Sequence, residues 1–408
     1  MGGSGVVRFV PFMTRMLALA GTLLALAGVA PASGKVGDLY ALRYGAKMNL
    51  LVPYDPVRLV PAAPALRLGH FATAWSISPD RSRFVAAAGW RPTRGELAAL
   101  RFVDLANGRI EGTMSLPGEF RRVTATAWVR GRVLAVVSGS NSTTVYSIDP
   151  DKRAAISQVK VPGAVVVGER IRNGIVLLLA APGLIGPATV AVVDQSPRVR
   201  TVLLDRISVG MTVTGIGPAR RTTIRRPGLA LAPSGASAFV FGANEPAAAI
   251  DLRTLAVRYP TLRMTATVKK QVEGSVRTAA TLPDGHIVVS GFDFGVAGST
   301  SLQLVNARDW SIRALNPATS WFRVGGGMIF TRGARGTGLR ILKPSGSVIE
   351  LFPGRSVGNV HVVGPRALVT FFGTKQKAAV IDLGTGRVVR QTVPAHPLIG
   401  AGQPIIVG

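Results

Sequence analysis

The sequence predicts an all-β fold in which four-stranded sheets repeat around a central axis as the blades of a single β-propeller. Apolar runs ending in aspartate recur along the chain at intervals of roughly 40 to 55 residues, the period of propeller blades. After each aspartate come a few turn residues and then a second run with alternating polar residues. Apolar residues make up 47% of the chain and aromatic residues 6%, with 48 Gly and 27 Pro. This composition favours many short strands joined by tight turns over helices.

The recurring aspartate marks the turn between the third and fourth strands of each blade. The residues in this position are Asp55, Asp104, Asp149, Asp194, Asp251 and Asp382, with Asn306 and Lys343 in equivalent turns. An aspartate that ends a strand accepts hydrogen bonds from backbone N–H groups and fixes the turn. One such residue per blade also places them far apart around a ring. We therefore interpret them as structural and predict no metal site.

The first and second strands of each blade are predicted from shorter patterns. First strands, the innermost of each blade, are expected near residues 73, 124, 164, 228, 277, 320 and 358. The second strands are continuous apolar runs, expected at 84–88, 133–137, 175–180, 238–241, 287–290, 328–331 and 367–372. Continuous apolar strands are typical of positions buried on both faces, here between neighbouring blades.

Eight aspartate-type turns are predicted against seven innermost strands, so one blade is expected to be split. Residues 38–69 would supply its two outer strands and residues 397–408 its two inner ones. Sharing one blade between the N- and C-terminal strands closes the ring and removes exposed sheet edges. We favour eight blades, with seven as the alternative if the Asp55 hairpin is an outer addition.

Residues 1–32 are predicted to be an export signal, and residues 33–408 the propeller domain. Arg8 and Arg15 precede the apolar stretch 16–29. The small residues Ala30 and Ala32 after it suit cleavage by a signal peptidase. An uncleaved N-terminal anchor is the alternative. The chain has no cysteine, which excludes disulfides and a lipid-modified N-terminus. We expect an exported protein, secreted or in a bacterial cell envelope.

The repeated units also resemble a known family. Units of the form SPD, FVAAAG and VDLANGRI or VIDLGTGRVV, over about residues 38–408, resemble the bacterial YVTN and WD40-like repeat propellers. The resemblance implies a propeller and an extracytoplasmic location. That group includes scaffolds, binding proteins and some enzymes, so no catalytic residue is carried over.

Motifs of enzymatic propellers are missing from the sequence. The five tryptophans share no common blade position, as quinone-dependent dehydrogenases would require, and the Ser-x-Asp-x-Gly-x-Thr-Trp box of sialidases does not occur. A lactonase-like hydrolase or lyase at the channel mouth is the alternative, and it would need Glu119, Glu169, Glu245 or Asp293 to converge. We expect a protein that is not an enzyme and binds no cofactor.

The four histidines do not form a recognisable metal site or catalytic triad. His70, His286, His361 and His396 stand alone, without partners at metal-ligand spacing. His70 and His396 border predicted innermost strands and could face the central channel. No Gly-x-Ser-x-Gly elbow or Walker-type phosphate loop is present.

Positive charge is the most suggestive functional feature. The formal net charge is +28, from 48 Lys and Arg against 20 Asp and Glu. Propeller loops between second and third strands share one face with the loops between blades, and we call this the loop face. We predict an anion-binding site there, made from Arg91, Arg94, Arg121, Arg122, Arg220, Arg221, Arg225, Arg226, Lys269, Lys270, Arg332 and Arg335. Converging guanidinium groups recognise carboxylate or phosphate by bidentate hydrogen bonds. The segment 207–227 is longer than an ordinary connection and is the best candidate for a specific role.

These observations predict a non-enzymatic binding protein. Outside the cytoplasm the anionic partner would be an envelope polymer or a partner protein, and we expect no nucleic acid. Peripheral association with a membrane or the cell wall is compatible with the charge, and we expect a monomer. The remaining alternative is a structural module of an envelope assembly whose basic surface has no binding role.

Overall fold

All regular elements in the described part of the protein are β-strands. The computed structural model describes residues 39–43, 49–55, 60–69, 74–88, 97–117, 122–182, 185–214, 221–242, 246–262, 274–294, 299–316, 321–333, 336–372, 378–392 and 405–407. The predicted signal peptide lies outside these residues. Among the described residues there is no helix long and apolar enough to cross a membrane.

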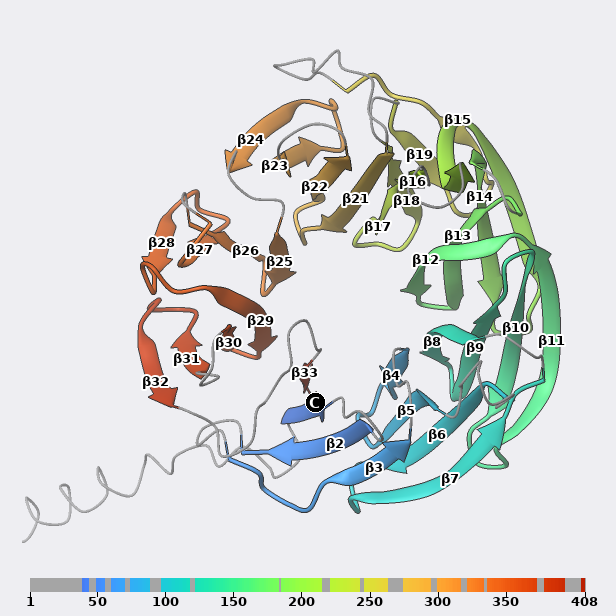
Figure 1. The fold of residues 1–408 in the computed structure, drawn as a ribbon, viewed down its shortest axis with the longest axis horizontal. Helices are drawn as coiled ribbons and strands as arrows, with labels where there is room; N and C mark the ends of the chain where they lie inside the picture. The colour runs from blue at the N-terminus through green and yellow to red at the C-terminus, as the bar shows by residue number, and fades with distance from the viewer. Residues whose placement is uncertain are drawn as a thin grey trace, which may run out of the picture.

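The strands form sheets arranged around a central axis, so the chain has the architecture of a β-propeller (Figure 1). The first three sheets contain β1 (Leu39–Arg43), β2 (Asn49–Tyr54), β3 (Leu66–Gly69) and β33 (Ile405–Val407); β4 (Trp75–Ile77), β5 (Arg83–Ala88), β6 (Ala99–Asp104) and β7 (Arg109–Ser115); and β8 (Arg122–Val129), β9 (Arg132–Ser138), β10 (Ser142–Asp149) and β11 (Ala154–Pro162). Three further four-stranded sheets contain β17 (Gly228–Leu231), β18 (Ser237–Phe241), β19 (Ala248–Asp251) and β20 (Val257–Arg258); β25 (Phe322–Gly325), β26 (Met328–Arg332), β27 (Leu339–Leu342) and β28 (Val348–Leu351); and β29 (Val357–Val363), β30 (Arg366–Phe371), β31 (Ala378–Asp382) and β32 (Val388–Thr392).

The seventh sheet has nine strands and joins two four-stranded meanders. One meander is β12 (Ala164–Ile171), β13 (Gly174–Ala180), β14 (Gly186–Asp194) and β15 (Val199–Thr214); the other is β21 (Gly274–Thr281), β22 (His286–Phe294), β23 (Ser299–Asn306) and β24 (Ile312–Asn316). They are linked by β16 (Arg221–Arg226), which pairs with β15 on one side and β21 on the other. Because one sheet contains two meanders, the number of blades cannot be taken from the seven sheets of the described residues.

The predicted inner strands are confirmed. Strands β4, β8, β12, β17, β21, β25 and β29 correspond to the seven predicted first strands and surround the centre of the ring (Figure 1). The second strands are buried as expected: every residue of β13 is buried, and Leu134 and Val136 of β9 share a core cluster with Leu177 and Leu179. Apolar packing between neighbouring sheets therefore forms the core.

The aspartates act as turn residues, as predicted. Oδ1 of Asp251 accepts hydrogen bonds from the backbone N–H groups of Arg253 and Thr254, at 2.9 and 2.8 Å. Equivalent turn bonds are made by Asp104, Asp149, Asp194 and Asp382, and by Asn306. The backbone hydrogen bond from Thr254 is the main reason that the pKa of Asp251 lies below its ordinary value. These carboxylates accept hydrogen bonds from the backbone of their own turns, which is a structural role.

The sheet shared by the two ends of the chain differs from the expected division. We predicted two strands from each end. Three of the described strands come from the N-terminal side, and β33 from the C-terminal side pairs with β1; the other predicted C-terminal run, before residue 405, lies outside the described residues. Residues 39–43 were not recognised as a strand of their own because no turn signature of the other blades separates them from β2. Tyr40 anchors this strand: its ring is buried, and its hydroxyl donates to the carbonyl of Leu105 at 3.2 Å.

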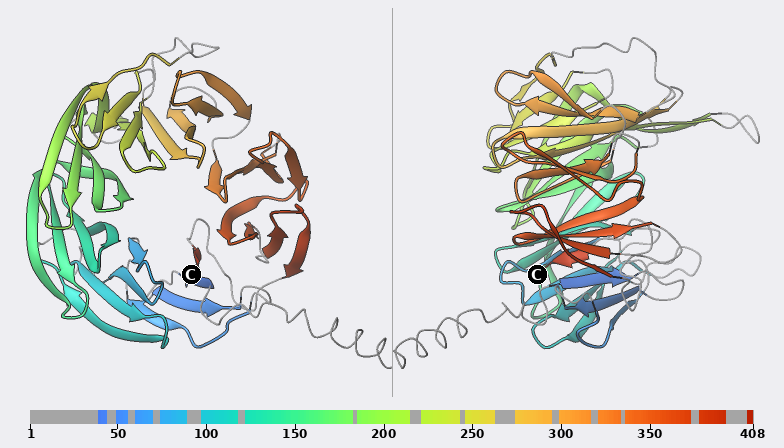
Figure 2. Two further views of the ribbon diagram at one scale, coloured as in Figure 1. Left: turned by 180° about the vertical axis from the view of Figure 1, so that it is seen from behind. Right: turned by 90° about the vertical axis from the view of Figure 1, so that its left-hand side faces the viewer.

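The segment 207–227, predicted to be a long loop, is largely a β-hairpin. Strand β15 is 16 residues long, and its last five residues pair with β16. We call residues 210–214 and 221–226 the arm; in the edge-on view of Figure 2 it projects from one face of the ring. The prediction was wrong because β-branched residues at Val213, Thr222 and Ile224 favour strand.

Candidate functional site

The candidate site lies where two innermost strands begin, on the loop face. Trp321 directly precedes β25, and Arg332 ends β26 of the same blade. The next innermost strand, β29, begins at Val357. All three positions are therefore at the end of the blades opposite the aspartate turns, next to the central channel.

One tryptophan contacts two arginines. The Cζ atom of Arg332 lies 5.6 Å from the centroid of the Trp321 ring, and that of Arg323 lies 5.8 Å from the same ring. A cation within about 6 Å of an aromatic face is attracted by the ring quadrupole. The indole therefore holds guanidinium groups from two neighbouring strands.

A third arginine is held in the same way. The Cζ atom of Arg355 lies 6.0 Å from the ring centroid of Phe352 and 5.5 Å from that of Phe371. The two phenylalanine rings pack edge to face, with centroids 4.9 Å apart. We call Trp321, Arg323, Arg332, Phe352, Arg355 and Phe371 the arginine–aromatic cluster.

Hydrogen bonds fix two of these arginines further. Nε of Arg323 donates to Oδ1 of Asn359 at 3.0 Å, and its Nη1 donates to the carbonyl of Phe322. Asn359 is 3% exposed, and its amide oxygen also accepts from the backbone N–H of Val360. Arg332 donates through Nη2 to the carbonyl of Val357 at 3.4 Å. Nε of Arg332 is buried and has no hydrogen-bond partner within the described residues.

The cluster carries positive charge that no carboxylate of the described residues pairs with. Across the described residues, no ion pair involves Arg323, Arg332 or Arg355. Burial lowers the pKa of Arg323. An arginine nevertheless stays protonated near neutral pH because its ordinary pKa is above 12. The cluster is therefore a set of three oriented cations.

His361 lies two residues beyond Asn359 on β29. Its Nε2 atom is buried and has no hydrogen-bond partner within the described part of the chain. Burial, and then the charge of Arg323, lower the pKa of His361 to about 4. The imidazole is therefore neutral at neutral pH and adds a polar group beside the arginines.

The described residues do not bring together the carboxylates that a lactonase-like site requires. Glu169 is on β12, where the surrounding protein displaces water and raises its pKa. Strand β12 lies across the ring from β29 and His361 (Figure 1). Glu119 and Glu245 are outside the described residues, and for Asp293 only the backbone in β22 is described. No group of three His, Asp or Glu side chains that could hold a metal ion occurs among the residues searched.

Only part of the predicted anion site can be located. Arg91, Arg94, Arg121, Arg220, Lys269, Lys270 and Arg335 lie outside the described residues, as do His70 and His396. Arg122 is exposed at the start of β8, and Arg221 is placed by its backbone opposite Thr214 in the arm. Arg225 and Arg226 lie at the root of the arm, where Nη2 of Arg226 donates to the carbonyl of Val166 at 3.4 Å.

Of the predicted arginines that the structure describes, Arg332 alone belongs to the arginine–aromatic cluster. Arg323, Asn359 and His361 were not predicted as site residues. A usable signal was present in the sequence, because Arg323 and His361 are charged or titratable residues within predicted innermost strands. Such strands border the channel, where a polar side chain can reach a ligand.

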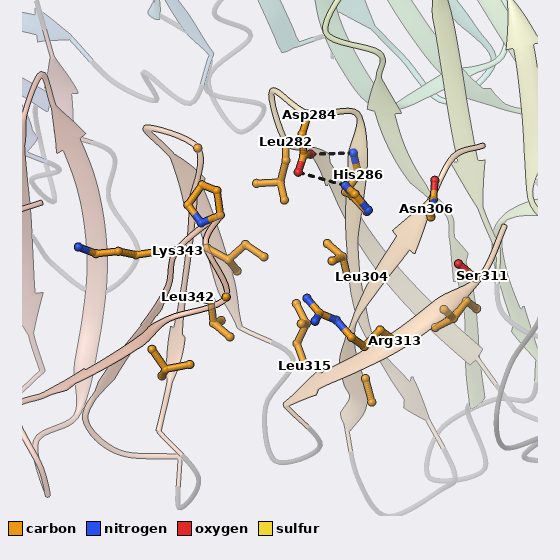
Figure 3. A pocket seen from close by; sticks show the side chains of 17 residues that line it. Leu282, Asp284, His286, Leu304, Asn306, Ser311, Arg313, Leu315, Leu342 and Lys343 are labelled. Atoms are coloured by element: carbon orange, nitrogen blue, oxygen red, sulfur yellow. Dashed lines mark hydrogen bonds and ion pairs between the residues drawn. The ribbon is translucent and has the colours of Figure 1, made fainter. Parts of the chain in front are cut away.

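A separate cleft of about 550 Å³ opens on the face that carries the aspartate turns (Figure 3). It lies between the β21–β24 meander and the β25–β28 blade. Leu304 and Leu315 line it, and Arg313 points into it. At its rim, Nδ1 of His286 lies 3.1 Å from Oδ2 of Asp284, so this histidine caps its own turn. The cleft is a gap in the packing between two blades.

Solved structures with a similar fold are propeller proteins. The dihydro-heme d1 dehydrogenase NirN, in complex with DHE, aligns with a TM-score of 0.57 and 11% identity over 90% of this chain and 76% of that one. Apo AztD from Citrobacter koseri aligns with a TM-score of 0.54 and 13% identity, over 90% of this chain and 96% of that one. No family model and no curated protein matches the sequence. At this identity the likeness shows the fold alone: the chain is a β-propeller protein.

Proposed function

We propose that this protein is an exported, non-enzymatic β-propeller that binds an anionic envelope polymer or partner protein through the loop face. The observation that carries the proposal is the arginine–aromatic cluster. Its three arginines are ordered by aromatic rings and backbone carbonyls, and no described carboxylate neutralises them.

The chemistry of the cluster suits recognition of carboxylate or phosphate groups. A guanidinium presents its N–H groups as a rigid fork, which matches two oxygens of such an anion. Stacking on Trp321, Phe352 and Phe371 restricts the side chains before a ligand arrives. Less conformational entropy is then lost on binding.

A hydrolase or lyase with a site at the channel mouth is the alternative. NirN is named a dehydrogenase, so the fold is compatible with catalysis. A feature of the described residues that favours the alternative is the neutral imidazole of His361 near Arg323. Within the described residues it lacks the carboxylate partner that would orient it as a base, and this supports binding over catalysis.

The test is binding of the full chain to poly-L-glutamate at several salt concentrations. Wild type should bind, and the affinity should fall as salt screens the charges. Replacing Arg332 and Arg355 with alanine should weaken binding about tenfold or more, since each charge-assisted hydrogen bond contributes about 1.5–3 kcal/mol.

The matched control replaces two arginines on the opposite face. Arg253 and Arg308 are exposed in aspartate-type turns, so the R253A/R308A variant loses the same net charge. It should bind nearly as wild type does. Equal loss in both variants would show that net charge alone attracts the polymer, and the cluster would have no specific role. A structural module without a binding role predicts no salt-sensitive binding in any variant.

We further propose a closed ring of eight blades. Eight antiparallel meanders of four strands are present in the described residues when the nine-stranded sheet is divided at β16, and β33 of one meander pairs with β1. Closure by this pairing would protect the edge of β1. The proposed export is tested by expressing the whole chain in a bacterial host and determining the N-terminus of the extracytoplasmic product, which should begin near residue 33. Recovery of the uncleaved chain with the membranes would support an anchor.

A further inference from the structure

The arm carries an apolar stripe that leaves the core and becomes exposed. Val209, Met211 and Val213 alternate along β15 and so lie on one face of the strand. Val209 is fully buried, whereas Met211 is 53% and Val213 is 42% exposed. Ile224 lies directly opposite Met211 in the hairpin and is half-buried. The stripe therefore continues a core cluster into solvent.

The same segment has an open backbone edge. Strand β14 accompanies β15 only as far as Gly186, which pairs with Val209. Beyond that point, no described strand pairs with residues 210–214 on the side away from β16; the backbone N–H of Ile185 donates to the Thr212 hydroxyl at 3.4 Å. An exposed strand edge is a template for an added strand, whose backbone supplies the hydrogen bonds and whose alternate side chains meet the adjoining face.

The positive charge of the arm favours an acidic segment as the added strand. Residues 207–227 contain four arginines and no aspartate or glutamate. Arg226 is exposed and lies two residues from Ile224, on the same face of β16. A second copy of the chain would bring like charges together, with a net charge of +28 on each molecule. An acidic partner is therefore favoured over self-association.

We propose that the arm is a docking site for an extended segment of a partner protein in which apolar and acidic residues alternate. The segment would add as a strand along residues 210–214. Its apolar side chains would cover Met211 and Val213, and its carboxylates would pair with the arm arginines. This inference rests on the proposed function and narrows its ligand to a protein. A polysaccharide offers carboxylates but neither a strand backbone nor apolar side chains.

The probe is a fluorescein-labelled synthetic decapeptide of alternating valine and glutamate, titrated with the full chain and followed by fluorescence anisotropy. The M211S/V213S variant should bind it about tenfold more weakly, because the apolar contact area is lost. Met211 is 53% and Val213 is 42% exposed, so the variant should lose little stability and keep a melting temperature close to that of wild type. The matched control is V388S/V389S on β32, where the valines are 39% and 51% exposed; it should bind as wild type does.

The outcomes separate this inference from the proposed function. Loss of peptide binding in R332A/R355A, with no change in M211S/V213S, would support the arginine–aromatic cluster and overturn the arm as a docking site. Loss in M211S/V213S alone would support the arm and count against the cluster. Poly-L-glutamate binding as tightly as the peptide, without dependence on Met211 and Val213, would also overturn the arm proposal. Binding of phosphatidylglycerol vesicles but not of the peptide would assign the arm to a membrane surface instead.

Discussion

The guanidinium of Arg332 lies over the indole ring of Trp321, with 5.6 Å between Cζ and the ring centroid. The two residues stand at the end of β26 and just before β25 in a single blade, and Arg323 contacts the same ring. One aromatic side chain thus orients cations that belong to different strands. A substitution of Trp321 should therefore change the orientation of both arginines without changing the net charge of the site.

Replacing Trp321 with leucine should weaken poly-L-glutamate binding by about tenfold, since two cation–π contacts of about 0.5–1 kcal/mol each are lost. Net charge is unchanged, so the salt dependence of the remaining binding should stay similar. Affinity at fixed ionic strength is the measurement. Wild-type affinity in W321L would mean that the arginines act only through their charge.

The stability of the protein should depend on pH through His361. Its pKa is 6.5 in an unfolded chain and about 4 in the folded protein, because burial and Arg323 disfavour the charged imidazole. The unfolding free energy is therefore highest above pH 6.5, where the imidazole is neutral in both states. It decreases as the pH falls, and the decrease is complete below about pH 4. A decrease in the unfolding free energy on the order of 3 kcal/mol is expected over this range.

The H361Q variant should remove most of this slope between pH 6.5 and pH 4. Urea unfolding at closely spaced pH values measures it. The same slope in H361Q and wild type would contradict a buried neutral imidazole and would assign the pH dependence to other groups.

Replacing Asp104 with alanine should lower the unfolding free energy by about 1–3 kcal/mol. Asp104 is 8% exposed, Oδ1 accepts from the backbone N–H of Asn107 at 3.0 Å, and Oδ2 lies 3.3 Å from Nε of Arg109. The D104N variant keeps an acceptor oxygen and should lose less. Urea unfolding at pH 7 compares the three proteins. A D104A variant as stable as wild type would show that the turn forms without the carboxylate.

The pairing of β1 with β33 can be tested with an engineered disulfide, because the chain has no cysteine of its own. Ala41 and Ile405 are register partners, and cysteines there should oxidise readily. The closed chain should unfold with a free energy higher by about 2–4 kcal/mol.

Cysteines at positions 41 and 406 serve as the control for that pairing. Neighbouring positions on a strand point to opposite faces, so this off-register pair should stay reduced. Mass spectrometry distinguishes the two states. Equal oxidation of both pairs would contradict a fixed register between the strands.

The strands and turns could be predicted because their causes are local. A residue such as Asp251 fixes a turn through bonds to residues two and three positions further on. An apolar run such as residues 174–180 indicates its own burial. These patterns need no knowledge of distant parts of the chain.

The arginine–aromatic cluster was not predicted because its geometry depends on contacts between different strands and on the packing of two blades. Arg323 meets Asn359, 36 residues away, and the contact depends on how two blades pack. The arm was missed for a different reason: its strands are evident in composition, but a hairpin outside the repeating pattern was interpreted as a loop. Strand β1 of the shared sheet was likewise missed, because no turn with the usual residues separates it from β2.

The nine-stranded sheet also bears on how the ring could open. Its two meanders are continuous through β15, β16 and β21, while the blade formed by β17–β20 lies between them around the axis (Figure 1). The two meanders on either side of that blade belong to the same hydrogen-bonded sheet. Its local unfolding would not by itself separate its neighbours, because β16 continues to hold them together. Strand β16, at the root of the arm, therefore links the β12–β15 meander directly to the β21–β24 meander.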